Sequence, residues 1–218
     1  MTTNLFNIFD PSTSIMNLEM NWISSMMIMI LMPNFIWIMP NRINMLINKI
    51  FHSLNNEMLM LYKSSNLKSP SFMFISLFMF ILLNNFLSLF PYIFSSTSHM
   101  VFSMTLAMPF WLFFTTMSMI KNTKNTIAHL IPLNTPIFLA PFMTLFETMS
   151  IMIRPLSLSV RLTANMIAGH LLMTLLNSNS FFMIIVLMIQ MFMMMIELCV
   201  AMIQSYVFSI LSSLYSSE

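Results

Sequence analysis

The chain has 218 residues, of which 58% are hydrophobic and only 6% are charged, and its formal net charge is +2. A soluble domain carries about 25% charged residues, so this composition excludes a water-soluble globular fold and indicates a chain surrounded by lipid. The basic residues form no cluster of the kind that binds nucleic acid, and the single cysteine excludes a disulfide or thiolate metal site within the chain.

The first half of the chain contains three apolar runs of ordinary membrane-spanning length. A helix crosses a hydrocarbon layer of about 30 Å with about 17–25 mostly apolar residues. After an N-terminal tail at 1–14, we predict one transmembrane helix at 15–39. Two more are predicted within 71–120, at 72–94 and 100–120.

Residues 40–70, between the first and second spans, mix apolar and charged residues. The apolar residues recur at helical spacing and comprise Ile43, Leu46, Ile47, Ile50, Phe51 and Leu54. The ionisable residues among them are Arg42, Lys49, His52, Glu57, Lys63 and Lys68. This pattern predicts an amphipathic helix that lies on the membrane surface with its polar side in water.

The basic residues also predict the orientation of the chain. Lys121 and Lys124 follow the third span, in a basic loop at 121–134, and residues 40–70 hold four more Lys or Arg. Because two spans separate these segments, both lie on one side of the membrane, the compartment from which the protein inserts. We call this the basic side; the N-terminus, which lacks Lys and Arg, lies on the opposite side. The C-terminal end has no basic residue, so its side stays open.

Residues 135–218 contain two longer apolar segments, 135–176 and 181–215, separated by Asn-Ser-Asn-Ser. As continuous helices they would be about 63 and 53 Å long, more than a perpendicular crossing needs. We therefore expect a hairpin of two long, steeply tilted intramembrane helices, with Pro136, Pro141 and Pro155 as bending points. The whole chain is predicted to be an all-α membrane protein of about five to six helices, including the surface helix.

Ionisable residues lie inside these two apolar segments, where a charge costs at least about 2.5–3.5 kcal/mol. They are Glu147, Arg154, Arg161, His170 and Glu197. Five such residues are too many to be accidental. Removal from water favours the neutral forms of the carboxylates and the imidazole unless a neighbouring arginine keeps them charged. Groups in this state can exchange protons near neutral pH.

Helical geometry assigns these groups to faces. Arg161 and Asn165 share one face of the first long helix, and Glu197 and Gln204 share one face of the second, so the two pairs can pack across the hairpin. His170 points away from Arg161, so one helix can serve two polar paths.

Structural interpretations of these residues stay open beside the functional one. Arg154 can extend to the membrane interface, or pair with Glu147 about two turns away. His170 can simply hydrogen-bond to a carbonyl. Gly169, the only glycine, lets a neighbouring helix approach closely. A purely structural explanation is weakest for Arg161, which has no acidic residue nearby in sequence.

Two motifs resemble a known family. Residues 154–172, RPLSLSVRLTANMIAGHLL, and 197–208, ELCVAMIQSYVF, are similar to the signatures of subunit a of the F-type ATP synthase in its mitochondrial form. Residues 4–13, NLFNIFDPST, resemble the start of insect members. The resemblance implies a non-catalytic, proton-translocating stator subunit of the Fo sector, multi-pass in the mitochondrial inner membrane. Its implied partners are a ring of c subunits, other Fo and peripheral-stalk subunits and membrane lipids.

By this resemblance Arg161 is the family's essential arginine. Its fixed charge would hold the carboxylate of a passing ring subunit ionised and block a direct proton leak between two offset half-channels. Asn165 and Gln204 would be its polar neighbours. No cofactor or metal is implied.

The same resemblance implies that Glu147, His170 and Glu197 line the proton routes. Bacterial members usually have Glu at the position of His170 and His at the position of Glu197, and the exchange here agrees with mitochondrial members. It leaves open which of the two residues serves which half-channel.

Two other classes of membrane protein compete with this interpretation. A haem-bearing subunit needs paired histidines on facing helices, but the four histidines, His52, His99, His129 and His170, are scattered. A redox-driven pumping arm would bury lysines, whereas every lysine here lies in a predicted loop or surface segment. A self-contained transporter often has inverted repeats, but the intramembrane ionisable residues all fall in the second half of the chain.

Overall fold

We describe the fold from a computed structural model, in which residues 5–13, 18–31, 39, 41–61, 71–90, 93–121, 123–131, 136, 138–177 and 183–217 are described. This part of the chain consists of helices and turns and contains no strand, so the all-α prediction is confirmed. Lys63, Lys68 and residues 178–180 of the predicted break lie outside the described residues.

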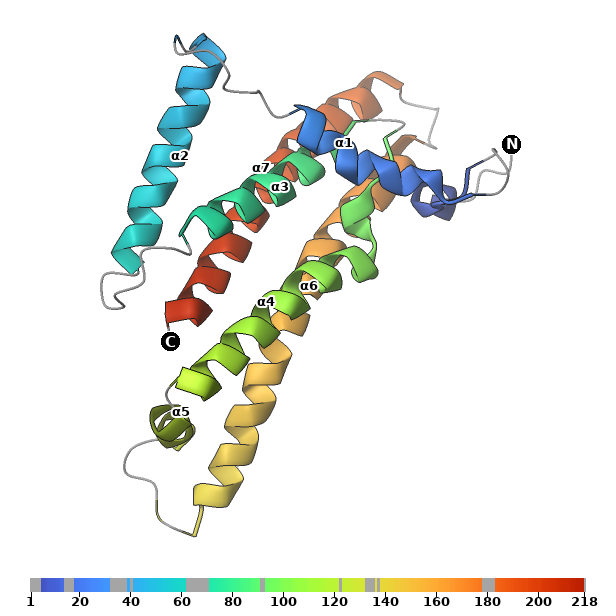
Figure 1. The fold of residues 1–218 in the computed structure, drawn as a ribbon. Helices are drawn as coiled ribbons and strands as arrows, with labels where there is room; N and C mark the ends of the chain where they lie inside the picture. The colour runs from blue at the N-terminus through green and yellow to red at the C-terminus, as the bar shows by residue number, and fades with distance from the viewer. Residues whose placement is uncertain are drawn as a thin grey trace.

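The α-helices in the described ranges are α1 (Ile23–Leu31), α2 (Arg42–Leu61), α3 (Ser71–Ser88), α4 (Met100–Lys121), α5 (Thr123–His129), α6 (Ala140–Asn177) and α7 (Met183–Ser217). Short 3-10 helices are η1 (Leu5–Phe9), η2 (Met20–Trp22) and η4 (Ser96–Ser98). The long helices α3, α4, α6 and α7 form an elongated bundle, with α2 along one edge and α1 across one end (Figure 1).

Within the described ranges, three helices are long and apolar enough to cross a membrane: Ser71–Ser88, Met100–Ile120 and Met183–Leu214. The second of the predicted spans ends at Ser88 rather than at Phe94. Pro91 follows closely in the sequence, and proline disfavours helix at the residue before it. The first predicted span is described only in part, because α1 covers nine residues and residues 32–38 lie outside the described ranges.

The C-terminal hairpin has the predicted form of two long helices. α6 has 38 residues and α7 has 35, which at 1.5 Å per residue makes them about 57 and 53 Å long. The three prolines predicted as bending points take different positions relative to α6. Pro155 lies inside α6, but Pro136 precedes the helix and Pro141 is its second residue, where no amide hydrogen is needed.

The bundle is held together by a small apolar core and by rows of small residues. The core joins α3, α4, α6 and α7 through Leu77, Ile81, Ala107, Leu158, Leu162 and Phe208. The second half of α7, which packs against α3, buries Ala201, Ser205, Ser209, Ser212 and Ser213. Small side chains let helix backbones approach closely in a membrane protein. By contrast, no residue of α7 before Ala201 is buried.

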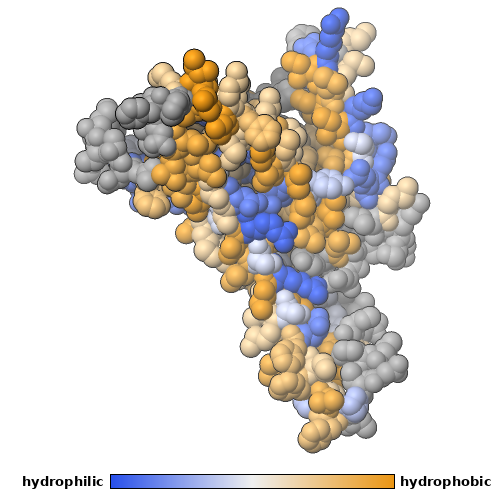
Figure 2. Space-filling view, turned by 180° about the vertical axis from the view of Figure 1, so that it is seen from behind, coloured by the Kyte–Doolittle hydropathy of each residue, from blue (hydrophilic) through white to orange (hydrophobic). Residues whose placement is uncertain are grey.

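Much of the outer surface is apolar, and the reverse face shows a polar patch partway along the molecule (Figure 2).

The side chain of Tyr206 on α7 donates a hydrogen bond to Glu57 Oε2 on α2 at 2.9 Å. The second half of α7 therefore lies beside α2, which belongs to one of the basic segments. With the orientation predicted from the basic residues, the C-terminal part of α7 and the start of α6 lie toward the basic side, and the start of α7 and the end of α6 lie toward the opposite side (Figure 1).

Candidate functional site

The hairpin brings Asn165 of α6 against Gln204 of α7. The Asn165 amide Nδ2 donates a hydrogen bond to Gln204 Oε1 at 3.3 Å, and the Gln204 side chain is buried. This contact confirms one half of the predicted packing, Asn165 against Gln204, whereas Glu197 packs on Gly169 rather than on Arg161. The two amides leave further donors and acceptors available to other polar groups or water.

Arg161 lies one turn before Asn165 on the same helix. Its side chain is exposed, and it forms no hydrogen bond or ion pair with any described residue. An uncompensated guanidinium in a long, mostly apolar hairpin is costly if lipid faces it. The residue therefore needs an acidic partner from another chain, or water, at this depth.

Glu197 of α7 lies directly over Gly169 of α6. A methyl group built on Gly169 would come within 2.6 Å of Glu197 Oε1 and 2.7 Å of its carboxyl carbon. The predicted close approach at the only glycine is therefore confirmed. Glu197 Oε1 is buried and accepts no hydrogen bond from the described residues. A buried carboxyl oxygen of this kind calls for a proton or a water molecule.

A cavity of about 220 Å³ lies between α3, α6 and α7, and Asn165, Gly169, Glu197 and Gln204 contribute to its lining. Room for one water takes about 10–15 Å³ on this measure, so the cavity can hold several. Asn85 of α3 also lines it. That side chain is completely buried, and neither of its amide atoms has a hydrogen-bond partner in the described part of the chain.

The sequence analysis did not identify Asn85 as a site residue. The available signal was the pair Asn84 and Asn85 in the middle of an otherwise apolar span, because polar side chains inside membranes are expensive and commonly functional. The Asn84 amide donates to the backbone carbonyl of Phe80 at 3.0 Å, whereas Asn85 faces the cavity. Only the second of the two asparagines therefore joins the site.

His170 adjoins Gly169 in sequence but contacts a different part of the molecule. Its ring meets Phe9 of η1 edge to face, with ring centroids 6.3 Å apart and an interplanar angle of 82°. Its Nε2 is buried and has no hydrogen-bond partner among the described residues. His170 and Asn165 therefore contact different elements, as their positions on the helix predicted.

Glu147 and Arg154 form an ion pair near the basic-side end of α6. Arg154 Nη2 lies 3.7 Å from Glu147 Oε1, and their side chains are 34% and 41% exposed. The structural ion pair considered from the sequence is therefore confirmed. The pair adjoins a larger cavity of about 560 Å³ between α4, α5 and α6, which Thr115, Ser118 and Thr126 also line.

The described residues contain no group of three or more His, Cys, Asp or Glu side chains that could hold a metal ion. The polar side chains that the structure shows at the site are carboxyl, imidazole, amide and guanidinium groups. Together these groups can pass protons and stabilise a negative charge.

Known proteins similar to this chain point in the same direction. Residues 15–217 match the family described as ATP synthase A chain. The chain is 77% identical to ATP synthase F(0) complex subunit a of Rhopalosiphum padi, over the full length of both proteins. It is also 49% identical to ATP synthase subunit a of Aedes aegypti and of Drosophila melanogaster, and in each case the match covers this whole chain and 99% of the relative.

Proposed function

We infer the function from one fact: this chain belongs to the ATP synthase A chain family, and so it is a multi-pass membrane subunit of the Fo sector and a component of a multi-subunit complex. Membership of this family replaces the haem-protein and self-contained-transporter alternatives. We propose that the subunit carries protons through two half-channels to and from a ring of c subunits, in the mitochondrial inner membrane. It would catalyse no bond-making step itself.

The proposal depends most on Arg161. This guanidinium is always charged, exposed on the hairpin and without a partner among the described residues. A carboxylate on a neighbouring ring would supply the missing charge. As each ring carboxyl group passes Arg161, the guanidinium would favour its ionised form and make it release its proton. A proton could not then cross directly from one half-channel to the other.

The arrangement of polar groups along α6 supports two half-channels. Toward the side of the membrane opposite the basic side, the 220 Å³ cavity with Glu197 and Gln204 offers a route for protons to the ring. Toward the basic side, the 560 Å³ cavity beside Glu147 offers a separate route. In the sequence of α6, Arg161 lies between Glu147, which lines one cavity, and Asn165, which lines the other. A ring carboxyl group would therefore have to pass Arg161 when it moves from one route to the other.

His170, Asn165 and Asn85 have supporting roles in this scheme. Protons would move between Glu197 and His170 along hydrogen-bonded groups or water, since both have a buried polar atom without a partner in the described residues. Asn85 and Asn165 would order water in the cavity that they line. Peripheral-stalk subunits would hold the chain still while the ring turns.

A comparison of two arginines on α6 tests the proposal. Arg161→Gln should reduce ATP synthesis by the intact complex in membrane vesicles to background, a loss of about 10²-fold or more, because charge stabilisation at the ring is removed. Arg154→Gln is the matched control, since it removes the same charge from a partly exposed ion pair, and it should retain most activity. Normal synthesis in the Arg161→Gln complex, assembled to the wild-type level, would contradict the proposal.

A further inference from the structure

We propose that Phe9 is a positioning residue for His170: its ring covers the imidazole at the opposite-side end of α6, fixes its orientation and separates it from bulk water. His170 then exchanges protons through the interior of the hairpin rather than directly with the compartment outside. This second statement depends on the proposed function, whereas the covering of His170 does not.

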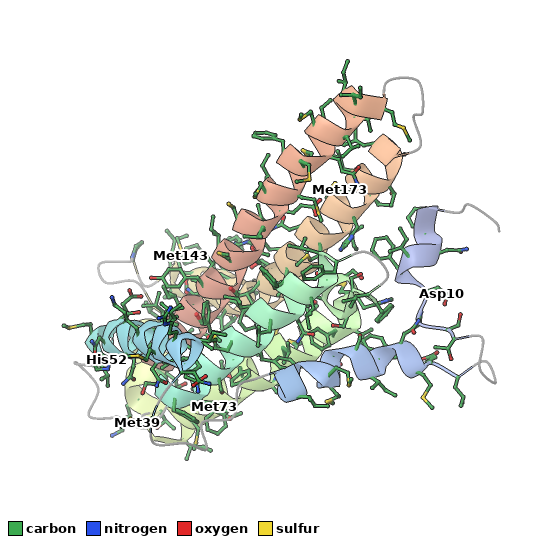
Figure 3. The ribbon with its side chains drawn as sticks, turned by 90° about the horizontal axis from the view of Figure 1, so that it is seen from above. Asp10, Met39, His52, Met73, Met143 and Met173 are labelled. Atoms are coloured by element: carbon green, nitrogen blue, oxygen red, sulfur yellow. The ribbon has the colours of Figure 1, made fainter. Side chains whose placement is uncertain are left out.

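The contact between the two rings is selective within η1. Phe9 is partly buried, whereas Phe6 is 69% exposed and Ile8 is 41% exposed. Of these three apolar residues, Phe9 is the one in ring contact with His170, edge to face at 6.3 Å. η1 itself packs against α6. Figure 3 shows η1, which ends just before the labelled Asp10, beside the end of α6 that carries Met173.

His170 has an unusual environment for a histidine. Its Nε2 has almost no contact with solvent and no hydrogen-bond partner among the described residues, although buried imidazole nitrogens are normally paired. An apolar ring on one side of the imidazole explains how solvent is kept away. Because the Phe9 ring is apolar, it offers no hydrogen-bond partner to His170 Nε2 from η1.

A network of hydrogen bonds holds η1 in place. The Asn21 amide donates to the carbonyl of Asp10 at 3.3 Å, and the Thr13 amide donates to the carbonyl of Leu18 at 3.0 Å. Next along the chain, the Trp22 ring packs on His99, with centroids 5.2 Å apart. Hydrogen bonds within the N-terminal segment and the Trp22–His99 contact therefore fix this segment against the turn between α3 and α4. Phe9 is held in position by the same contacts.

The other titratable groups around this end of α6 are Glu197 on α7, Asp10 after η1 and His99 after η4. Glu197 touches Gly169, the neighbour of His170, from inside the hairpin. Asp10 is exposed, and hydrogen bonds from the backbone amide and then the hydroxyl of Ser12 hold the pKa of its carboxyl below the usual value. Of these groups, Glu197 is the acid in contact with the residue beside His170.

The first experiment measures how fast diethyl pyrocarbonate modifies His170 in the intact complex in membranes, followed on the peptide that contains it by mass spectrometry. Phe9→Ala should make modification several-fold faster, and Phe9→Leu, which keeps an apolar cover, should restore the slow rate. Phe6→Ala is the matched control and should leave the rate unchanged, because Phe6 belongs to the same short helix but is exposed. Equal rates in the wild type and Phe9→Ala, or the same increase in Phe6→Ala, would overturn the proposal.

A second measurement separates covering from function. The pH profile of ATP synthesis, varied on the side of η1, should shift in Phe9→Ala and stay in place in Phe6→Ala and Phe9→Leu. If His170 becomes reactive in Phe9→Ala while the profile does not move, the covering stands and the role in proton exchange is wrong. If the Phe9→Ala complex does not assemble, Phe9→Val carries both measurements. Failure of the proposed function is detected separately, by normal synthesis in Arg161→Gln.

Discussion

The two ends of the α6 segment hold their carboxyl groups in opposite ways. At the basic-side end, Glu147 has a cationic partner, Arg154, at 3.7 Å, and both side chains are at least a third exposed. At the opposite end, Glu197 packs on Gly169 with a buried oxygen that has no partner in the described residues, and His170 lies under Phe9. The carboxyl group at the first end is partly exposed and ion-paired, and the carboxyl group at the other end has a buried oxygen without a partner among the described residues.

Under the proposed function, this difference gives the hairpin two kinds of proton site, one with Glu147 on α6 and one with Glu197 on α7. In that proposal, a partly exposed carboxyl group beside an arginine suits a group that passes protons outward to water. In the same proposal, a covered carboxyl group without a partner in the described residues suits an inward relay. Arg161, between the two ends, separates the environments.

The largest effect should come from removing the ionisable group at the covered end. Glu197→Gln keeps the shape of the side chain but cannot exchange a proton, so we expect proton transport by the complex to fall about 10²-fold. Glu147→Gln should cost clearly less, because water can replace a partly exposed carboxylate. Proton flux in vesicles, followed with a pH-sensitive dye, measures both. Equal losses in the two variants would break the comparison between the ends.

An intermediate effect is expected at the glycine. Gly169→Ala places a methyl group 2.6 Å from Glu197 Oε1, so the carboxyl group must move. Because it is the end of a flexible side chain beside a cavity, it can move at little cost to stability, and the effect falls on its position. ATP synthesis should decrease several-fold while the complex still assembles. The amount of assembled complex on native gels is the control. Unchanged synthesis would show that the exact location of the Glu197 carboxyl group is unimportant.

The smallest effect should come from the ion pair. A double-mutant cycle of Glu147→Gln and Arg154→Gln, evaluated from ATP synthesis rates, should give a coupling energy below about 1 kcal/mol, since partly exposed pairs are screened by water. The double variant should therefore resemble the product of the two single variants. A much larger coupling would mean that the basic-side end is as dry as the other.

Much of the hairpin could be predicted from the sequence because its determinants are local. The lengths of the two apolar segments determine the lengths of α6 and α7, and helical periodicity was enough to bring Asn165 and Gln204 to facing positions. The role of Gly169 as a place of close approach followed from its being the only glycine. These features depend on residues within one helix or two neighbouring helices.

The remaining features depend on contacts between distant segments. Asn85 joins the cavity only because α3 packs against α7, which no periodicity within α3 reveals. The contact of Phe9 with His170 joins the start of the chain to α6. The helix α5 within the predicted basic loop and the end of α3 at Ser88 were also missed, since helix ends respond to nearby turns more than to hydropathy.

The row of serines on α7 has a mechanical consequence. Ser205, Ser209, Ser212 and Ser213 let this helix lie close to its neighbours, and closely packed protein interiors have low compressibility. The second half of α7 is therefore held rigidly by its neighbours. The first half has no buried residue and is held less firmly. A sideways force on the first half of α7 would bend that half and leave Gln204, which lies in the closely packed half, nearly still.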